Sequence, residues 1–204
     1  GWYLEGKKVN DGEWNIAQDC TLVAEWKPIM YGITYSLNGG ENNASNISSY
    51  TVEDEFTLQD PERNGYIFDG WTTDGVAKPV KNLEITLGSH GDKMFEAHWT
   101  AASYNVTFDA NGGDCSVAQE TFTFDREYTL PVSARVGYIF VGWYYETLKV
   151  ESSVWQISED CTLKAKWSAR TDTPYIVNHY RENADDDDYT LFESENLTGI
   201  SDSV

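Results

Sequence analysis

The sequence predicts a β-rich α+β protein, built as a tandem array of small modules that are each a mixed sheet of about four strands with little helix. The phrase GYIFDGW at 65–71 returns as GYIFVGW at 137–143, 72 residues apart when counted from Trp71 to Trp143. Each copy is followed by an alternating segment that ends in a second tryptophan, FEAHW or LKAKW. No stretch shows sustained 3.6-residue periodicity, so at most one short helical turn is expected in each module.

The repeat divides the 204 residues into four predicted segments. The C-terminal half of a module covers 1–27, complete modules cover 31–100 and 103–168, and a partial module of another kind covers 171–204. Units of about 70 residues bury only about 60–65% of their unfolded surface, so each core is small. Large aromatic rings, which make up 14% of this chain, fill such a core efficiently.

Each complete module is expected to begin with a hairpin. In the second complete module, Tyr104, Val106 and Phe108 alternate with polar residues, as is typical of a half-buried strand. Asn111-Gly112-Gly113 follows, and these residue types tolerate the positive φ angles that a tight turn requires. The first complete module repeats this order with Tyr31, Ile33, Tyr35 and Leu37, followed by Asn38-Gly39-Gly40.

A short connection containing a proline leads to a third strand, and a closing strand ends the module. The third strand is the alternating phrase Gly-Tyr-x-Phe-x-Gly-Trp. The closing strand of the second complete module places Leu163, Ala165 and Trp167 on one face, because side chains alternate along a strand. The same large, small, large pattern is formed by Leu22, Ala24 and Trp26 in the half-module and by Phe95, Ala97 and Trp99 in the first complete module.

The recurring aromatic residues are assigned to the cores and not to a carbohydrate-binding platform, because they lie at fixed module positions with inward phase. Burying one tryptophan removes about 150–250 Å² from water, worth about 4–6 kcal/mol before opposing terms. Trp14 and Trp155, whose position is held by Leu83 in the first complete module, are better candidates for partial exposure. The predicted core residues are Trp2, Trp26, Tyr66, Phe68, Trp71, Trp99, Tyr138, Phe140, Trp143 and Trp167.

The charge balance excludes several classes of partner. The chain has 34 acidic and 14 basic residues, a formal net charge of −20. Nucleic-acid binding needs clustered lysine and arginine, so none is expected, and docking on anionic lipid is disfavoured. No apolar run approaches the roughly 18 residues that span a membrane, so we expect no membrane insertion by this segment. Acidic surfaces favour solubility and repulsion between neighbouring molecules.

No spacing of residues predicts catalysis, a cofactor or a metal. The three histidines and three cysteines are scattered, and Cys20, Cys115 and Cys161 are expected to be free thiols. The run Asp185–Asp188 lacks the alternation and the glycine of a calcium loop, so we expect a solvated hairpin tip. Nucleophile-elbow, zinc-protease and nucleotide-binding motifs do not occur. We therefore predict no enzyme activity and no cofactor.

The residues that carry the repeat also resemble a known family. VTFDANGG at 106–113, GYIFVGWYY at 137–145 and CTLKAKW at 161–167 are similar to the Listeria–Bacteroides repeat, the B-repeat type of internalin surface proteins. The resemblance covers about 1–168 and implies a β-grasp, ubiquitin-like fold in extracellular bacterial proteins, where such repeats stand between an adhesive domain and the cell wall. The first complete module departs from the pattern, because it has 28 positions between its two tryptophans against 24 in the second.

The last segment differs from the repeat. Residues 175–180 alternate like a strand, and 189–193 are predicted to return as a second strand after a turn. YIVNHYREN and YTLFESENLTG resemble the first hairpin of the mucin-binding-protein repeat family, covering about half of such a unit. A lone hairpin is marginal in water. Either the segment is cut short or it pairs with other strands, and one option is exchange with the half-module in the same or another molecule. The oligomeric state stays open.

The leading hypothesis is a non-catalytic repeat segment of a bacterial protein at the cell surface or cell wall, acting as a stalk or spacer with a role in adhesion. Short linkers such as 27–30 and 100–103 would limit bending. The alternative is a recognition module that binds a host surface protein or a glycan through loops or an exposed sheet edge. An enzyme is a third hypothesis, which no group of residues supports.

Overall fold

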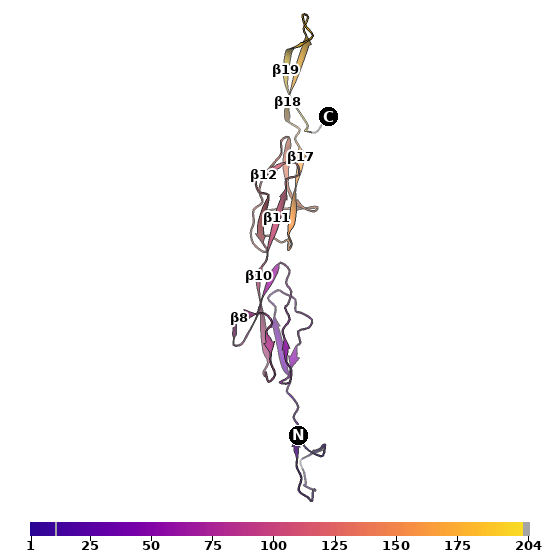
Figure 1. Cartoon of the computed structure of the whole chain (residues 1–204), viewed down its shortest axis with the longest axis vertical. Coiled ribbons are helices and arrows are strands. Elements are labelled where there is room, and N and C mark those ends of the chain that lie inside the picture. Colours follow the sequence, from indigo (N-terminus) through magenta and orange to yellow (C-terminus); the bar gives the residue numbers. More distant parts are fainter. Residues whose placement is uncertain (11, 202–204) are drawn as a thin grey trace. The chain divides into compact units, whose positions relative to one another are not determined.

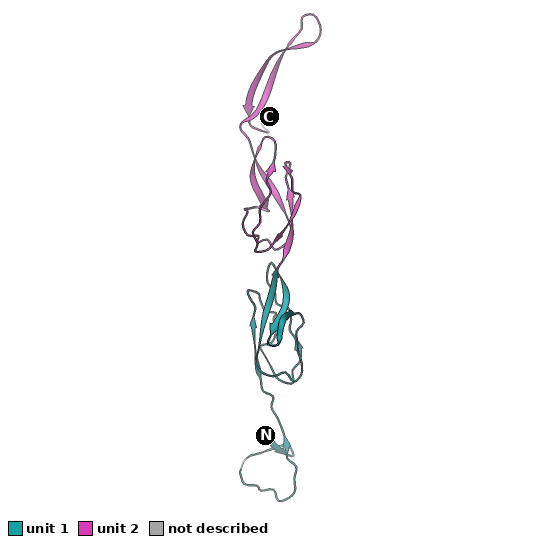
Figure 2. Cartoon of the chain, turned by 90° about the vertical axis from the view of Figure 1, so that its left-hand side faces the viewer, with its two compact units in different colours: residues 1–100 teal, residues 101–204 magenta. Residues whose placement is uncertain are grey.

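The computed structural model describes residues 1–10 and 12–201, and all regular structure among them is β (Figure 1). The predicted β-rich character is confirmed, whereas the helical part of the predicted α+β class is not found in these residues. The chain divides into two compact units, Gly1–Thr100 and Ala101–Val204 (Figure 2). Position 11 of the predicted half-module and positions 202–204 of the predicted last segment lie outside the described residues.

The half-module forms a small antiparallel sheet. Its strands are β1 (Trp2–Leu4), β2 (Lys7–Val9) and β3 (Val23–Ala24), in the spatial order β2-β1-β3. A tight turn joins β1 to β2 through Glu5 and Gly6, which have φ angles of 48° and 77°. β1 pairs with β3 through Trp2 opposite Ala24. This sheet therefore contains only the third, fourth and closing strands of a module.

The first complete module forms a mixed five-stranded sheet. Its strands are β4 (Tyr31–Ser36), β5 (Ser49–Tyr50), β7 (Tyr66–Thr73), β8 (Val76–Val80) and β10 (Lys93–Ala101). Their spatial order is β5-β4-β10-β7-β8, so the first and closing strands are neighbours at the centre. β4 and β10 run parallel, in register from Ile33 opposite Lys93 to Ser36 opposite Glu96. A separate short pair joins β6 (Phe56–Thr57) to β9 (Glu84–Ile85).

The second complete module repeats this topology. Its sheet consists of β11 (Ser103–Asp109), β13 (Gln119–Thr123), β15 (Tyr138–Tyr145), β16 (Leu148–Val150) and β17 (Cys161–Ala169), in the order β13-β11-β17-β15-β16. β11 and β17 are parallel. The extra short pair here is β12 (Asp114–Cys115) with β14 (Ser133–Ala134). Each sheet has five strands and not about four, because a turn after the phrase tryptophan starts a short edge strand, β8 or β16.

A glycine in the repeated phrase is required by a bulge in the third strand. The register of β15 against β17 shifts between Phe140 and Gly142, which leaves one residue without a partner. Gly142 has a φ of 142° and Gly70 a φ of 141°, in the region that favours glycine. A Cβ atom on Gly70 would lie 2.5 Å from the backbone nitrogen of Val80. The positive φ angle therefore explains why a glycine precedes the tryptophan in both copies, and in the second copy this glycine lies at the bulge.

Each complete module has its own aromatic core. In the first, the Trp71 ring lies against Tyr35, Phe68 and Phe95, with ring centroids 5.3–6.4 Å apart. These are the tilted and edge-on geometries that aromatic pairs prefer. The first core consists of Ile33, Tyr50, Leu58, Phe68, Trp71, Ile85, Phe95 and Ala97. The second consists of Val106, Phe108, Phe122, Trp143, Trp155, Leu163 and Ala165.

The tail forms a long hairpin, as predicted. Its strands are β18 (Thr173–Glu182) and β19 (Tyr189–Gly199), which pair antiparallel from Thr173 opposite Gly199 to Glu182 opposite Tyr189. Most of its residues are exposed on both faces. The segment after β19 returns to the end of the second module, where the Ser201 backbone nitrogen donates to the carbonyl of Arg170 at 2.9 Å. The hairpin therefore adds little buried surface of its own.

Candidate functional site

The most distinctive local arrangement joins the closing tryptophan to the first hairpin turn. Trp99 Nε1 donates to the carbonyl oxygen of Leu37 at 2.9 Å. The indole also covers the second glycine of the turn, since a Cβ atom on Gly40 would lie 2.4 Å from Trp99 Cζ2. In the second module, Trp167 donates to Ala110 at 3.0 Å and covers Gly113 in the same way. We call this arrangement the Trp–turn contact.

The asparagine of each turn reinforces the contact from the other side. Asn38 has a φ of 49°, and its Nδ2 donates to the carbonyl oxygen of Ala97 at 2.9 Å. Asn111 has a φ of 48° and donates to Ala165 at 3.0 Å. Asparagine tolerates this left-handed conformation better than most residues. The sequence identified these residues as turn formers but did not reveal that they bind the closing strand.

An arginine that the sequence analysis missed stacks on the tyrosine of each repeated phrase. The guanidinium of Arg63 lies 3.6 Å from the ring centroid of Tyr66, and its Nη1 donates to the carbonyl oxygen of Asn38 at 2.9 Å. Arg135 lies 3.8 Å from the ring centroid of Tyr138. Such cation–π contacts contribute about 0.5–1 kcal/mol at exposed sites. The sequence signal that could have identified these arginines is their position, two residues before the first glycine of the repeated phrase in both copies.

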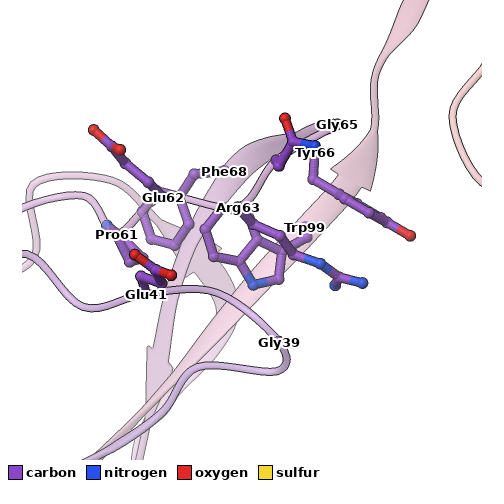
Figure 3. Close-up of a pocket in the computed structure, with 10 residues that line it drawn as sticks. Gly39, Glu41, Pro61, Glu62, Arg63, Gly65, Tyr66, Phe68 and Trp99 are labelled. Atoms are coloured by element: carbon purple, nitrogen blue, oxygen red, sulfur yellow. The ribbon is translucent and has the colours of Figure 1, made fainter. Parts of the chain in front are cut away.

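A groove of about 630 Å³ lies beside the Trp–turn contact of the first complete module (Figure 3). Glu41 and Glu62 both line the groove, and two backbone hydrogen bonds join them, with N–O distances of 2.7 and 2.9 Å. Carboxylates, a guanidinium and aromatic rings suit a small polar ligand. In the second module, Asp114 and Ala134 occupy the positions of the two glutamates. The other side chains with polar or aromatic groups that line the groove are Arg63, Asn64, Tyr66, Phe68 and Trp99.

The predicted core residues of the complete modules differ in their depth. Trp71 and Trp143 are only 0% and 1% exposed, and Phe68 is also buried. Trp99, Phe140 and Trp167 are partly buried and pack on the edge of their cores. Tyr66 and Tyr138 are partly buried beneath the stacked arginines.

Two tryptophans expected in a core are instead exposed. Trp2 is 56% and Trp26 is 90% exposed, although both occupy module positions that are covered in the complete modules. The physical reason is that, in the described residues, the sheet of the half-module consists of β1, β2 and β3, and no strands of a first hairpin pack against it. Trp26 therefore has no Asn-Gly-Gly turn to cover within its own sheet.

The prediction of partial exposure is wrong for Trp155, which is 1% exposed. Its ring centroid lies 5.0 Å from the ring centroids of both Phe122 and Tyr128. Backbone bonds with Asp125 and Arg126 hold the segment over the core. Periodicity could not reveal this burial, because Trp155 lies outside any regular strand. Trp14, in the equivalent place of the half-module, is 56% exposed.

The titratable side chains do not converge. Among the described residues, no group of three or more His, Cys, Asp or Glu could hold a metal ion. The four aspartates lie at the hairpin tip, where Asp186 Oδ1 accepts bonds from Asn183 Nδ2 at 2.7 Å and from the Asp188 nitrogen at 3.0 Å. This agrees with the expected solvated tip. Residues 1–10 and 12–201 also include no helix long and apolar enough to cross a membrane.

The three cysteines are free thiols, as predicted. Cys20 is exposed, whereas Cys115 and Cys161 are partly buried against the second core. Burial, together with the negative charges of Glu159 and Asp160, raises the pKa of Cys161 to about 11. The thiolate, which is the reactive form, is therefore scarce at this position near neutral pH.

Comparison with known proteins identifies the repeat. The sequence profile of the Listeria–Bacteroides repeat domain matches residues 31–98 and 104–166, which together are more than half of the chain. The chain belongs to the Listeria–Bacteroides repeat family. The two matched ranges cover most of the two five-stranded sheets. Each includes one Asn-Gly-Gly turn and most of the closing strand, and ends one residue before the closing tryptophan, Trp99 or Trp167.

Two relatives of this chain occur in Evansella cellulosilytica. One, provisionally named a membrane protein, is 28% identical over 204 residues, covering 95% of this chain and 29% of the relative. Another, provisionally named a Gly-rich membrane protein, is 29% identical over 154 residues, covering 72% of this chain and 17% of the relative. The chain thus spans less than a third of the length of these relatives. No solved structure matches it.

Gly40→Ala is expected to destabilise the first complete module by about 1–3 kcal/mol, because the added methyl group would displace the Trp99 ring. Chemical denaturation of the chain would measure this loss. Gly32→Ala is the matched control in the same module, since its Cβ would meet only the Asp92 side chain, at 3.6 Å or more. Equal effects of the two substitutions would contradict the steric role of the Trp–turn contact.

Cys161 is expected to react with iodoacetamide far more slowly than exposed Cys20 at pH 8, because its raised pKa and burial suppress the thiolate. Mass spectrometry of labelled peptides measures both rates. The raised folded-state pKa also means that the thiol's contribution to stability is present below about pH 9 and is lost as the pH rises toward 11. Equal labelling of the two cysteines at pH 8 would contradict the assignment.

Proposed function

We propose that this segment is a non-catalytic spacer in a bacterial protein exposed outside the cell, where it holds an adhesive region away from the cell wall. The observation that carries the proposal is the succession of two modules of one topology, in which the recurrent aromatic residues serve packing. Only one residue, Ala102, separates the closing strand β10 from the next first strand β11 along the chain. A connection of this length restricts the bending of a spacer.

We further propose that each module is a β-grasp. A first hairpin, a crossover, and a closing strand that returns parallel to the first strand at the sheet centre support this proposal. An irregular crossover takes the place where a helix is usual. The tail hairpin supports a second proposal, that 171–201 begins a module of the mucin-binding type.

Two further features support a location outside the cell. The relatives are provisionally named membrane proteins, and the repeat family is typical of surface proteins. The net charge of −20 keeps neighbouring copies apart, as a crowded surface requires.

Deleting residues 31–102 from the full-length protein should bring the segment before it closer to the cell wall. The expected change is about 30 Å, the length of a nine-residue strand such as β10. Super-resolution distance measurement between a tag before this segment and the labelled wall would detect it. Replacing the module by a Gly-Ser stretch of equal length is the control, which should broaden the distances. An unchanged distance, or a tag inaccessible to protease on intact cells, would contradict the proposal.

A second function, glycan recognition, is favoured by the groove of the first complete module. Tyr66 and Trp99, both partly buried, contribute aromatic surface to its lining, and Glu41 and Glu62 offer carboxylate acceptors for hydroxyl groups. In the second module, Ala134 occupies the position of Glu62, so this function would be restricted to the first module.

Glu62→Ala should weaken glycan binding about tenfold, because it removes a charged acceptor. A glycan array followed by titration of the whole chain would measure this. Glu53→Ala, on an exposed residue of the same module that does not line the groove, is the control. Failure of the chain to bind any glycan, or equal binding by both variants, would refute this second function.

A further inference from the structure

The two ends of each complete module lie on neighbouring parallel strands. The chain enters the first complete module at the start of β4 and leaves it at the end of β10. Because β4 and β10 are parallel, the entry and exit points lie at opposite ends of the pair. A pulling force along the chain would therefore slide one strand past the other. β11 and β17 have the same arrangement in the second module.

Side-chain bonds extend this parallel pair at both ends. Near its start, Asp92 Oδ1 accepts a hydrogen bond from the Gly32 backbone nitrogen at 2.7 Å. Near its end, the Trp–turn contact and Asn38 join the first hairpin turn to the closing strand. The second module repeats the first of these bonds, with Asp160 Oδ1 accepting from the Asn105 nitrogen at 2.7 Å.

We propose that each complete module is a mechanical clamp that resists tension along the chain. The inference rests on the proposed spacer role, since a spacer that joins an attached adhesive region to a cell carries tension. Sliding loads all the bonds between the two strands at once, so they must break together. Opening a hairpin from its ends loads one bond at a time. The same hydrogen bonds therefore resist far more force in the first geometry than in the second.

The tail hairpin provides the contrasting geometry within the same chain. β18 enters and β19 leaves at the same end of the hairpin, where Thr173 lies opposite Gly199. Tension on the two ends of the hairpin therefore opens it pair by pair, although its ladder is longer than that of β4 with β10. The hairpin, which has more paired residues, should thus resist less force than the β4–β10 pair, which has fewer.

Single-molecule pulling on the whole chain, with handles at its two ends, tests the clamp. We expect two unfolding events at high force, one for each complete module and each releasing about 200 Å of chain. The tail hairpin should open in a separate event at much lower force and release less chain, because it contains fewer residues than a module. Complete modules that unfold at forces no higher than the hairpin would overturn the proposal.

Two matched substitutions separate mechanical from general stability. Asp92→Ala removes the bond to Gly32 across the parallel pair. Asp54→Ala removes a bond of the same kind and length to the Thr51 nitrogen, together with one from Thr51 Oγ1 at 2.9 Å, within a local turn. Asp92→Ala should speed unfolding at constant force about tenfold, whereas Asp54→Ala should leave this rate almost unchanged. Chemical denaturation gives the equilibrium loss of each variant as a reference.

Equal unfolding rates of the two variants under force would overturn the clamp. This failure differs from a failure of the spacer role, because the distance between tag and wall is measured on cells without applied tension. A chain can therefore act as a spacer without a clamp, and the two experiments distinguish these cases.

Discussion

The Trp–turn contact is the constraint that closes each complete module, because it connects parts of the chain that are far apart in sequence. Trp99 binds a carbonyl 62 residues earlier, and Trp167 binds one 57 residues earlier. The contact satisfies the indole N–H, positions the closing strand on the first hairpin and covers one side of the core. Loop-closure entropy opposes pairing at such separations, so specific bonds are needed at the point of closure. Gly40 and Gly113 allow the indole rings to approach the turns this closely, because a Cβ atom at either position would clash with the ring.

In the half-module, the closing strand pattern occurs without first-hairpin strands packed against it in the described residues. Its closing segment ends in a tryptophan at the module position of Trp167, yet Trp26 is 90% exposed. The third, fourth and closing strands form their antiparallel ladders without the first hairpin, but no core gathers over them in the described residues. The first hairpin is thus the element that converts a pattern of apolar residues into a buried core.

The topology also relates the fold to its proposed role. Placing the first and closing strands side by side puts the chain's entry and exit on the central, doubly flanked pair of the sheet. Modules can then follow one another with a single connecting residue, while the edge strands and loops stay free to vary. The groove near Glu62 illustrates this freedom, since Ala134 holds that position in the second module without a change in strand order. A shared strand order with different surface residues suits a spacer in which single modules can also bind a ligand.

The sequence by itself determined the repeat, the alternating strands, the Asn-Gly-Gly turns and the burial of Trp71 and Trp143, because these are local patterns or patterns that recur at a fixed spacing. The tertiary structure alone decided that Trp155 is buried and Trp26 is exposed. It also decided that Arg63 stacks on Tyr66 and that each closing strand lies parallel to the first. These outcomes depend on which distant segment covers a side chain, and periodicity along one strand carries no information about its partner.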